Sequence, residues 1–234
     1  MGILHSLELW LGLARGMLGQ ALGLPNPWEH SIRAFEARDR RNPPDQGAIV
    51  FVGSSSFTLW SSMEKDMAPL PVVNRGFGGA MIDDVVRYAD RIVVPYHPAA
   101  VVLFAGTNDI SGARPASAEY VAERFDAFVA RVRLALPEAL IFYVAITPSR
   151  ARWSLWPVVM EANRFIEARV RADARLRFID LGRFLLGPDG TPAPEFYRSD
   201  GLHPSKSGYR IWAREIAAAL HRETALMLKL GVPD

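Results

Sequence analysis

The sequence contains no cysteine, which excludes disulfides, thiolate nucleophiles and metal sites built on cysteine. Histidine is also scarce, with five residues scattered along the chain: His5, His30, His97, His203 and His221. Their positions do not follow the spacings that are typical of zinc or iron ligands. We therefore expect no metal ion in this protein.

The sequence also has no large excess of positive or negative charge. The 234 residues include 27 Lys and Arg against 25 Asp and Glu, which gives a formal net charge of +2. Arginines are densest between residues 164 and 183, where acidic residues interrupt them, a pattern typical of a solvated and salt-bridged surface. Proteins that bind nucleic acid usually concentrate basic residues in one stripe. We therefore expect no nucleic-acid partner.

Long hydrophobic runs are missing too. Residues 1–24 are rich in apolar side chains, but they lack a basic start and are interrupted by Glu8 and Arg15. These features argue against an export signal and against a membrane span, so we expect a cytoplasmic protein. Apolar residues recur there at helical spacing, which predicts a helix that packs on the domain or in a homodimer. The alternative is a lid or a helix that associates with a membrane surface.

The sequence does contain short apolar runs that alternate with segments of helical spacing. The apolar runs are continuous, as is typical of strands that are buried on both faces. Strands are predicted at 48–53, 71–74, 99–106, 140–146 and 176–181, and helices at 81–93, 117–136, 157–174 and 206–228. This order predicts an α/β domain over residues 45–234, a three-layer sandwich with a central, mostly parallel five-stranded sheet. Residues 1–44 are predicted to form an N-terminal helical extension and linker.

Polar and glycine-rich segments follow the predicted strands. In parallel sheets, ligands bind beyond the carboxyl ends of the strands. The segments at those ends are GSSS (53–56), NRGFGG (74–79), AGTND (105–109) and TPSR (147–150), and DGLHP (200–204) precedes the last predicted helix. We therefore expect a reactive site among these five segments.

Two of these segments contain candidate side chains for a nucleophilic site. A serine in the turn after Gly53 lies at the sheet edge near the positive end of a helix dipole, which favours a nucleophile. The alternative is that these serines only cap the helix. His203 is a candidate base, and Asp200, three residues earlier, is a candidate carboxylate to orient its ring. The alternative for His203 is an ordinary loop residue.

Two further segments offer hydrogen-bond donors. The side-chain amide of Asn108 and the backbone N–H groups of the glycine-rich segment are donors of the kind that stabilise an oxyanion during acyl transfer. The alternatives are an Asx-turn at Asn108 and simple turn geometry at the glycines.

Together, G-S-S-S-F-T-L-W, N-R-G-F-G-G, G-T-N-D and D-G-L-H-P resemble, in this order, the four blocks of the SGNH or GDSL hydrolases. The resemblance covers about residues 48–215 and implies a flavodoxin-like fold without a cofactor. It implies a catalytic triad of Ser55, Asp200 and His203, with an oxyanion hole formed by Ser55, Gly79 and Asn108. Ser54 departs from the family, which has an aspartate there; we expect Ser54 to brace the turn and Ser56 to cap the helix.

The resemblance implies a serine esterase that hydrolyses carboxylic esters, and we expect small ester substrates with short acyl or acetyl groups. Trp153, Leu155 and Trp156, together with Ser54, are candidates for lining the substrate pocket; the alternative for the apolar three is packing against the next helix. A carbohydrate O-acetylesterase, a thioesterase, a lysophospholipase or an acyltransferase would use the same residues. A non-catalytic binding module is the alternative from another class.

Overall fold

The structure is a computed structural model that describes residues 18, 19, 22, 27–112, 114–223, 226, 228, 230 and 231. Most of the predicted N-terminal helix, residues 1–24, therefore lies outside the described residues, and its packing, membrane and dimer roles stay predictions. Across the residues that are described, no helix combines the length and the apolar character needed to cross a membrane.

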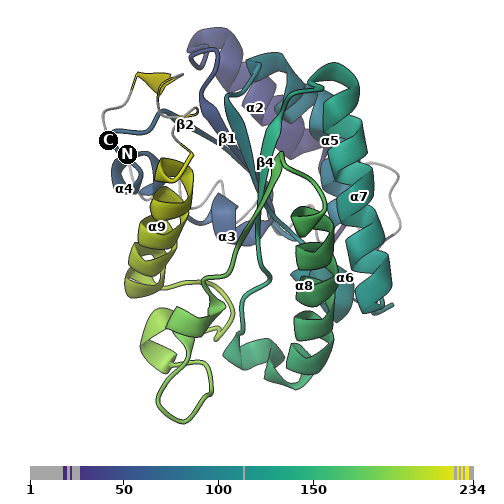
Figure 1. Cartoon of the computed structure of the whole chain (residues 1–234), viewed down its shortest axis with the longest axis vertical. Coiled ribbons are helices and arrows are strands. Elements are labelled where there is room, and N and C mark those ends of the chain that lie inside the picture. Colours follow the sequence, from purple (N-terminus) through teal and green to yellow (C-terminus); the bar gives the residue numbers. More distant parts are fainter. Residues whose placement is uncertain are drawn as a thin grey trace.

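A five-stranded parallel sheet forms the centre of the domain (Figure 1). Its strands lie in the order β2-β1-β3-β4-β5, and every neighbouring pair is parallel. The strands are β1 (Ile49–Gly53), β2 (Val72–Gly76), β3 (Ala100–Phe104), β4 (Leu140–Val144) and β5 (Leu176–Ile179). All five lie where the sequence predicts a strand, and the predicted α/β fold is confirmed.

The register of the central strands brings their carboxyl ends to one level. Gly53 at the end of β1 pairs with Gly76 of β2 on one side and with Phe104 of β3 on the other. The segments that follow these three strands therefore leave the sheet side by side. This is the edge at which parallel sheets bind ligands.

Helices cover both faces of the sheet, as Figure 1 shows. One face carries α2 (Glu29–Arg41), α5 (Ile82–Ile92), α7 (Ala118–Ala135) and α8 (Trp156–Arg171), and the other carries α3 (Ser55–Thr58), α4 (Met63–Asp66) and α9 (Lys206–His221). Along β1, Val50 and Val52 pack into the first core, whereas Ile49 and Phe51 pack into the second. The strand is therefore buried on both faces, which explains its continuous apolar run. Helix α9 ends at His221, where the prediction extended it to residue 228.

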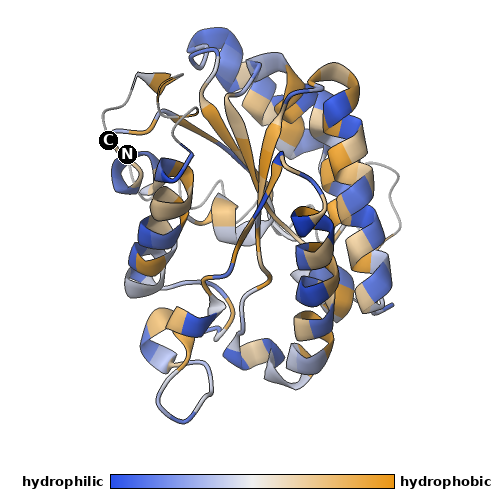
Figure 2. Ribbon diagram, viewed as in Figure 1, coloured by the Kyte–Doolittle hydropathy of each residue, from blue (hydrophilic) through white to orange (hydrophobic). Residues whose placement is uncertain are grey.

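Shorter helices shape the ends of the domain. They are α6 (Thr107–Ser111), η1 (Val94–Tyr96), η2 (Arg150–Leu155), η3 (Gly182–Leu185) and η4 (Pro194–Phe196). Figure 2 shows hydrophobic strands at the centre and helices that combine hydrophobic and hydrophilic residues around them. Such helices bury an apolar stripe and leave a polar surface, which closes the three layers.

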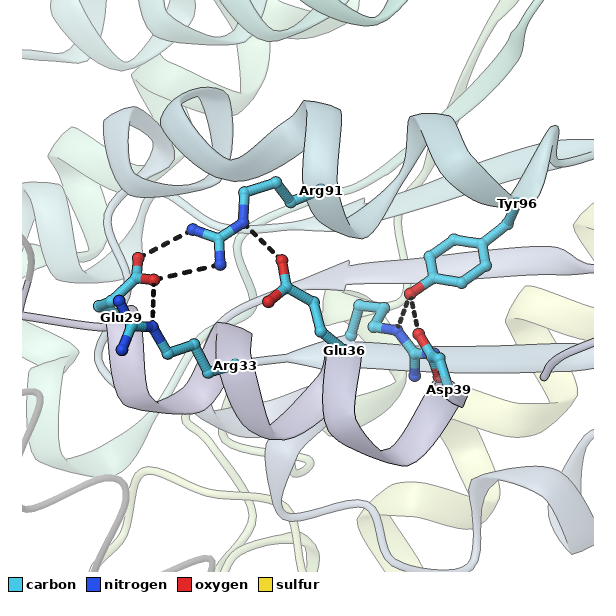
Figure 3. A network of polar contacts seen from close by, with 7 residues as sticks. Glu29, Arg33, Glu36, Asp39, Arg91 and Tyr96 are labelled. Carbon is cyan, nitrogen blue, oxygen red and sulfur yellow. Dashed lines mark hydrogen bonds and ion pairs between the residues drawn. The ribbon is translucent and has the colours of Figure 1, made fainter. Parts of the chain in front are cut away.

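Helix α2 belongs to the core although it lies within the predicted extension. Its side chains Ile32 and Phe35, with the preceding Trp28, are buried in the first core. Arg91 of α5 donates hydrogen bonds to Glu29 and Glu36 of α2, as Figure 3 shows. The last turn of α2, residues 38–41, also lies within residues 1–44, the predicted extension and linker. The division of the chain at residue 44 stays a prediction.

A buried ion pair fastens the end of α2 to the sheet. Arg75 of β2 is 3% exposed, and its guanidinium lies 2.6 Å from the Asp39 carboxylate. The Tyr96 hydroxyl accepts from Arg75 at 2.7 Å and donates to Asp39 at 2.6 Å (Figure 3). Burial and the hydrogen bond to Asp39 raise the pKa of Tyr96 to about 12, so the phenol keeps this proton at neutral pH. Because the Arg75 side chain is buried, loss of Asp39 would leave its charge without this counter-ion, which destabilises the fold.

A buried carboxyl joins α6 to the start of α5. Asp109 is 2% exposed, and the Ile82 backbone N–H donates to both of its carboxyl oxygens at 3.3 Å. Burial raises the pKa of Asp109 from 3.8 to about 7. The folded protein therefore holds this proton at pH values where the unfolded chain has lost it.

This linkage predicts how Asp109→Asn changes stability with pH. Because the folded pKa is raised, the contribution of Asp109 to the free energy of unfolding falls as the pH rises from about 4 to about 7. Asparagine has no proton to lose, so the variant should gain stability relative to the native chain between pH 5 and pH 8. Urea unfolding of both proteins at the two pH values measures this, and an equal difference at both would contradict it.

Candidate active site

Three side chains from the two ends of the domain form a continuous chain of hydrogen bonds. The His203 Nε2 atom lies 2.8 Å from Ser55 Oγ, and its Nδ1 atom lies 2.7 Å from Asp200 Oδ2. Ser55 and His203 are 148 residues apart in the sequence. The structure thus brings together the serine, the imidazole and the carboxylate that the sequence analysis singled out.

The positions of the protons along these hydrogen bonds follow from which groups can donate. An ionised carboxylate only accepts, so Nδ1 of His203 carries the proton toward Asp200, and Nε2 is left to accept from the Ser55 hydroxyl. Burial alone would raise the pKa of Asp200. Hydrogen bonds from the His203 ring and from the backbone N–H groups of His203 and Leu202 outweigh burial, so the pKa of Asp200 lies below its usual value. The carboxylate is therefore ionised at neutral pH.

The turn after β1 places Ser55 at the sheet edge. Gly53 has φ 151°, and a Cβ atom there would lie 2.0 Å from the carbonyl oxygen of Phe104. Only glycine fits at this point, because β1 and β3 approach so closely. Ser54 is extended and precedes α3, so Ser55 becomes the first residue of that helix. Its hydroxyl then faces His203.

The short loop before α9 aims Asp200 and His203 at one point. Asp200 Oδ1 accepts from the backbone N–H groups of Leu202 at 2.8 Å and His203 at 3.0 Å. The other oxygen, Oδ2, contacts the imidazole. One carboxylate thus shapes the loop and orients the ring together, which gives the D-x-x-H spacing its physical reason.

Two contacts that the sequence analysis missed fasten this loop and α9 to α3. The Tyr209 hydroxyl donates to the Ser56 carbonyl at 2.7 Å, and Arg198 donates to the Leu59 carbonyl at 3.1 Å. Both span well over one hundred residues, so neither contact has a signal in the local sequence. These two hydrogen bonds hold the segment of Ser55 and the segment of His203 against each other.

Asn108 and the glycine-rich segment lie against each other. The Asn108 side-chain nitrogen donates to the Ala80 carbonyl at 3.0 Å. The neighbouring Gly79 has φ 80°, a left-handed conformation that favours glycine. Structure and sequence therefore agree that these two segments meet, while the roles of Gly79 and Asn108 as oxyanion donors stay predictions.

Arg152 of η2 is a further polar residue at this edge. Its guanidinium donates to Thr107 Oγ1 at 2.8 Å and to Asn108 Oδ1 at 3.2 Å. Burial lowers the pKa of Arg152 below its usual range. The sequence analysis singled out the segment around it for its apolar residues and overlooked the arginine itself.

The three candidate pocket residues of η2 and α8 each take part in packing. The rings of Trp153 and Trp156 stack with centroids 5.7 Å apart and an interplanar angle of 18°. Leu155 and Trp156 are half-buried and pack against the first core. This packing matches the alternative that the sequence analysis named, and a role of these three residues in lining a substrate pocket stays a prediction.

The two serines beside Ser55 have different outcomes: Ser54 stabilises the turn, but not through its hydroxyl, and Ser56 does not cap the helix. Ser54 is fully buried, and its hydroxyl has no hydrogen-bond partner among the described residues. It braces the turn through its backbone instead, because its N–H donates to Phe104 and its carbonyl accepts from Phe57 and Thr58. The prediction that Ser56 caps the helix is wrong, since Ser54 occupies the N-cap position and Ser56 lies inside α3.

Residues that would hold a metal ion do not gather at this edge. Among the described residues, no group of three or more His, Asp or Glu side chains lies close enough to bind one.

Comparisons with known proteins identify the family of the chain. Residues 51–211 match the model of the GDSL-like lipase/acylhydrolase family. No curated protein matches the chain.

Solved structures share the fold. A protein from Streptococcus pneumonia has a TM-score of 0.71 and 20% identity, with 86% of this chain and 98% of that chain covered. A GDSL-like lipase from Bacteroides thetaiotaomicron has a TM-score of 0.68 and 18% identity, with 82% and 97% covered. An acetyl esterase with a bound acetate ion has a TM-score of 0.57 and 19% identity, with 75% and 97% covered. The chain belongs to the GDSL-like lipase/acylhydrolase family and is a carboxylic ester hydrolase.

Proposed function

We propose that this chain is a serine esterase in which Ser55 is the nucleophile, His203 the general base and Asp200 the residue that orients the imidazole. The observation that carries this proposal is the hydrogen-bonded chain from Ser55 Oγ through the imidazole to the Asp200 carboxylate. This arrangement activates a hydroxyl that is otherwise a weak nucleophile. The same contacts argue against a non-catalytic binding module, which has no use for an oriented base.

The first half of the reaction transfers the acyl group to the enzyme. Ser55 Oγ attacks the ester carbonyl as its proton passes to His203 Nε2, and the carbonyl oxygen becomes an oxyanion. When the tetrahedral intermediate collapses, the bond to the alcohol oxygen breaks and His203 returns the proton to that oxygen. In the second half, His203 Nε2 takes a proton from water as the water oxygen attacks the acyl carbon. The bond from the acyl carbon to Ser55 Oγ then breaks, His203 returns the proton to Oγ, and the carboxylic acid leaves.

The oxyanion needs donors on the side of the carbonyl that faces the sheet edge. We assign the backbone N–H groups of Ser55 and Gly79 and the side-chain amide of Asn108 to this role. In support, neither N–H donates a backbone hydrogen bond to a described residue. The Asn108 amide has two N–H bonds and donates to one described acceptor, Ala80.

Substitution of the three serines tests the assignment of the nucleophile. Ser55→Ala removes the attacking oxygen, so kcat for p-nitrophenyl acetate should fall by more than about 10⁴-fold. Ser54→Ala and Ser56→Ala are the matched controls and should keep a substantial part of the activity, because the hydroxyl of neither residue contacts His203. Steady-state kinetics of the three variants measure this. If Ser56→Ala or Ser54→Ala is the inactive variant, the assignment is wrong.

We further propose short acyl groups, acetyl among them, as the natural acyl part of the substrate. One observation supports this: an acetyl esterase is among the structural neighbours of the chain. We expect kcat/KM to be highest for acetyl and butyryl p-nitrophenyl esters and to fall toward decanoyl. A preference for decanoyl or longer esters in this series would overturn the proposed acyl size while leaving the nucleophile unaffected.

A further inference from the structure

Arg152 reaches the proposed oxyanion donor from a different part of the chain. It lies in η2, after β4, and both of its terminal nitrogens donate to Asn108 Oδ1 at 3.2 Å. One of them also donates to Thr107 Oγ1 at 2.8 Å. These contacts hold the guanidinium over the first turn of α6.

The guanidinium has no acidic partner at this place. Many arginines of this protein form ion pairs, but Arg152 forms none with a described carboxylate. A partly buried cation without a counter-ion is costly, because its water shell is lost without a compensating charge. The conformation of Arg152 is also unusual, since φ −124° and ψ 23° interrupt η2 at that residue. Packing alone does not explain why a cation is held here.

The contacts of Arg152 fix which way the Asn108 amide points. A guanidinium only donates, so the atom facing Arg152 has to be the amide oxygen. The backbone carbonyl of Ala80 only accepts, so the atom facing it has to be the amide nitrogen. The two partners together exclude the flipped amide and leave the second N–H bond of the nitrogen for another acceptor.

We propose that Arg152 is a positioning residue for ester hydrolysis: it holds the Asn108 amide with its free N–H available to the oxyanion and polarises that amide. The proposal rests on the esterase function and on the role of Asn108 proposed above. The positive charge draws electron density toward Oδ1, which makes the N–H a stronger donor. The N–H stabilises the substrate oxygen more strongly as negative charge develops on that oxygen. The effect of Arg152 is therefore larger in the transition state than in the ground state.

A double-mutant cycle tests whether Arg152 acts through Asn108. Asn108→Ala should lower kcat for p-nitrophenyl acetate by about 10²–10³-fold, as loss of one oxyanion donor does. Arg152→Gln should lower kcat by a smaller factor, about 10-fold or more, with KM nearly unchanged. In the Asn108→Ala background, Arg152→Gln should cost less than about 2-fold, because its target is gone. An equal loss in both backgrounds would overturn the proposal.

Two further variants separate this role from a structural one. Arg152→Lys keeps a charge and a donor, so it should retain more activity than Arg152→Gln. Arg164→Gln removes an exposed guanidinium on the neighbouring α8 and should leave kcat unchanged. Thermal unfolding of each variant checks the fold. If Arg152→Gln does not fold, Arg152→Lys carries the same cycle.

The choice of ester separates this role from recognition of an anionic substrate. A positioning residue should matter equally for p-nitrophenyl acetate and for the anionic mono-p-nitrophenyl succinate. A loss confined to KM for the succinate would overturn the proposal, because Arg152 would then bind the substrate carboxylate. Ser55→Ala, measured in parallel, distinguishes failure of the esterase mechanism from failure of the proposed role of Arg152. Activity that persists without Ser55 overturns the esterase mechanism, whereas activity that depends on Ser55 but not on Arg152 overturns only the role of Arg152.

Discussion

The hydrogen bond between His203 Nε2 and Ser55 Oγ joins the loop after the first strand to the loop before the last helix. Because 148 residues separate the two, every layer of the domain has to be in place before they meet within 2.8 Å. The parallel sheet sets the position of Ser55 through the register of β1 against β2 and β3. Helix α9 sets the position of His203 from the opposite end of the chain. The proposed activity therefore depends on the folded domain more than on any local segment.

Several groups around the Ser55–His203 contact hold it in place. Tyr209 and Arg198 connect the histidine side of the site to the carbonyls of α3, and Asp200 shapes its own loop while it orients the imidazole. The Arg152 guanidinium likewise donates hydrogen bonds to the Asn108 side chain. Such supporting contacts matter because a catalytic group displaced by about 1 Å loses much of its effect. The buried pair of Arg75 and Asp39 lies apart from this site and anchors α2 to the sheet instead.

Much of this architecture could be predicted from the sequence, since continuous apolar runs mark buried strands and four of the five site segments follow one of them. The meeting of Ser55, His203 and Asp200 was also predictable, from the order of four short blocks. Arg152, Arg198 and Tyr209 were not, because their partners lie far along the chain and a lone arginine or tyrosine has no local pattern. Ser56 was assigned to the cap because the sequence does not show at which serine α3 begins. That boundary depends on the extended backbone of Ser54.

The most direct test of this account is to map where a fluorophosphonate probe attaches, because such probes phosphonylate a serine that an adjacent imidazole has activated. Intact-mass analysis followed by peptide sequencing of the labelled protein locates the adduct. The account predicts one adduct per chain, on Ser55, and none when His203 is replaced by alanine. An adduct on Ser54 or Ser56, or labelling that survives the loss of His203, would contradict it.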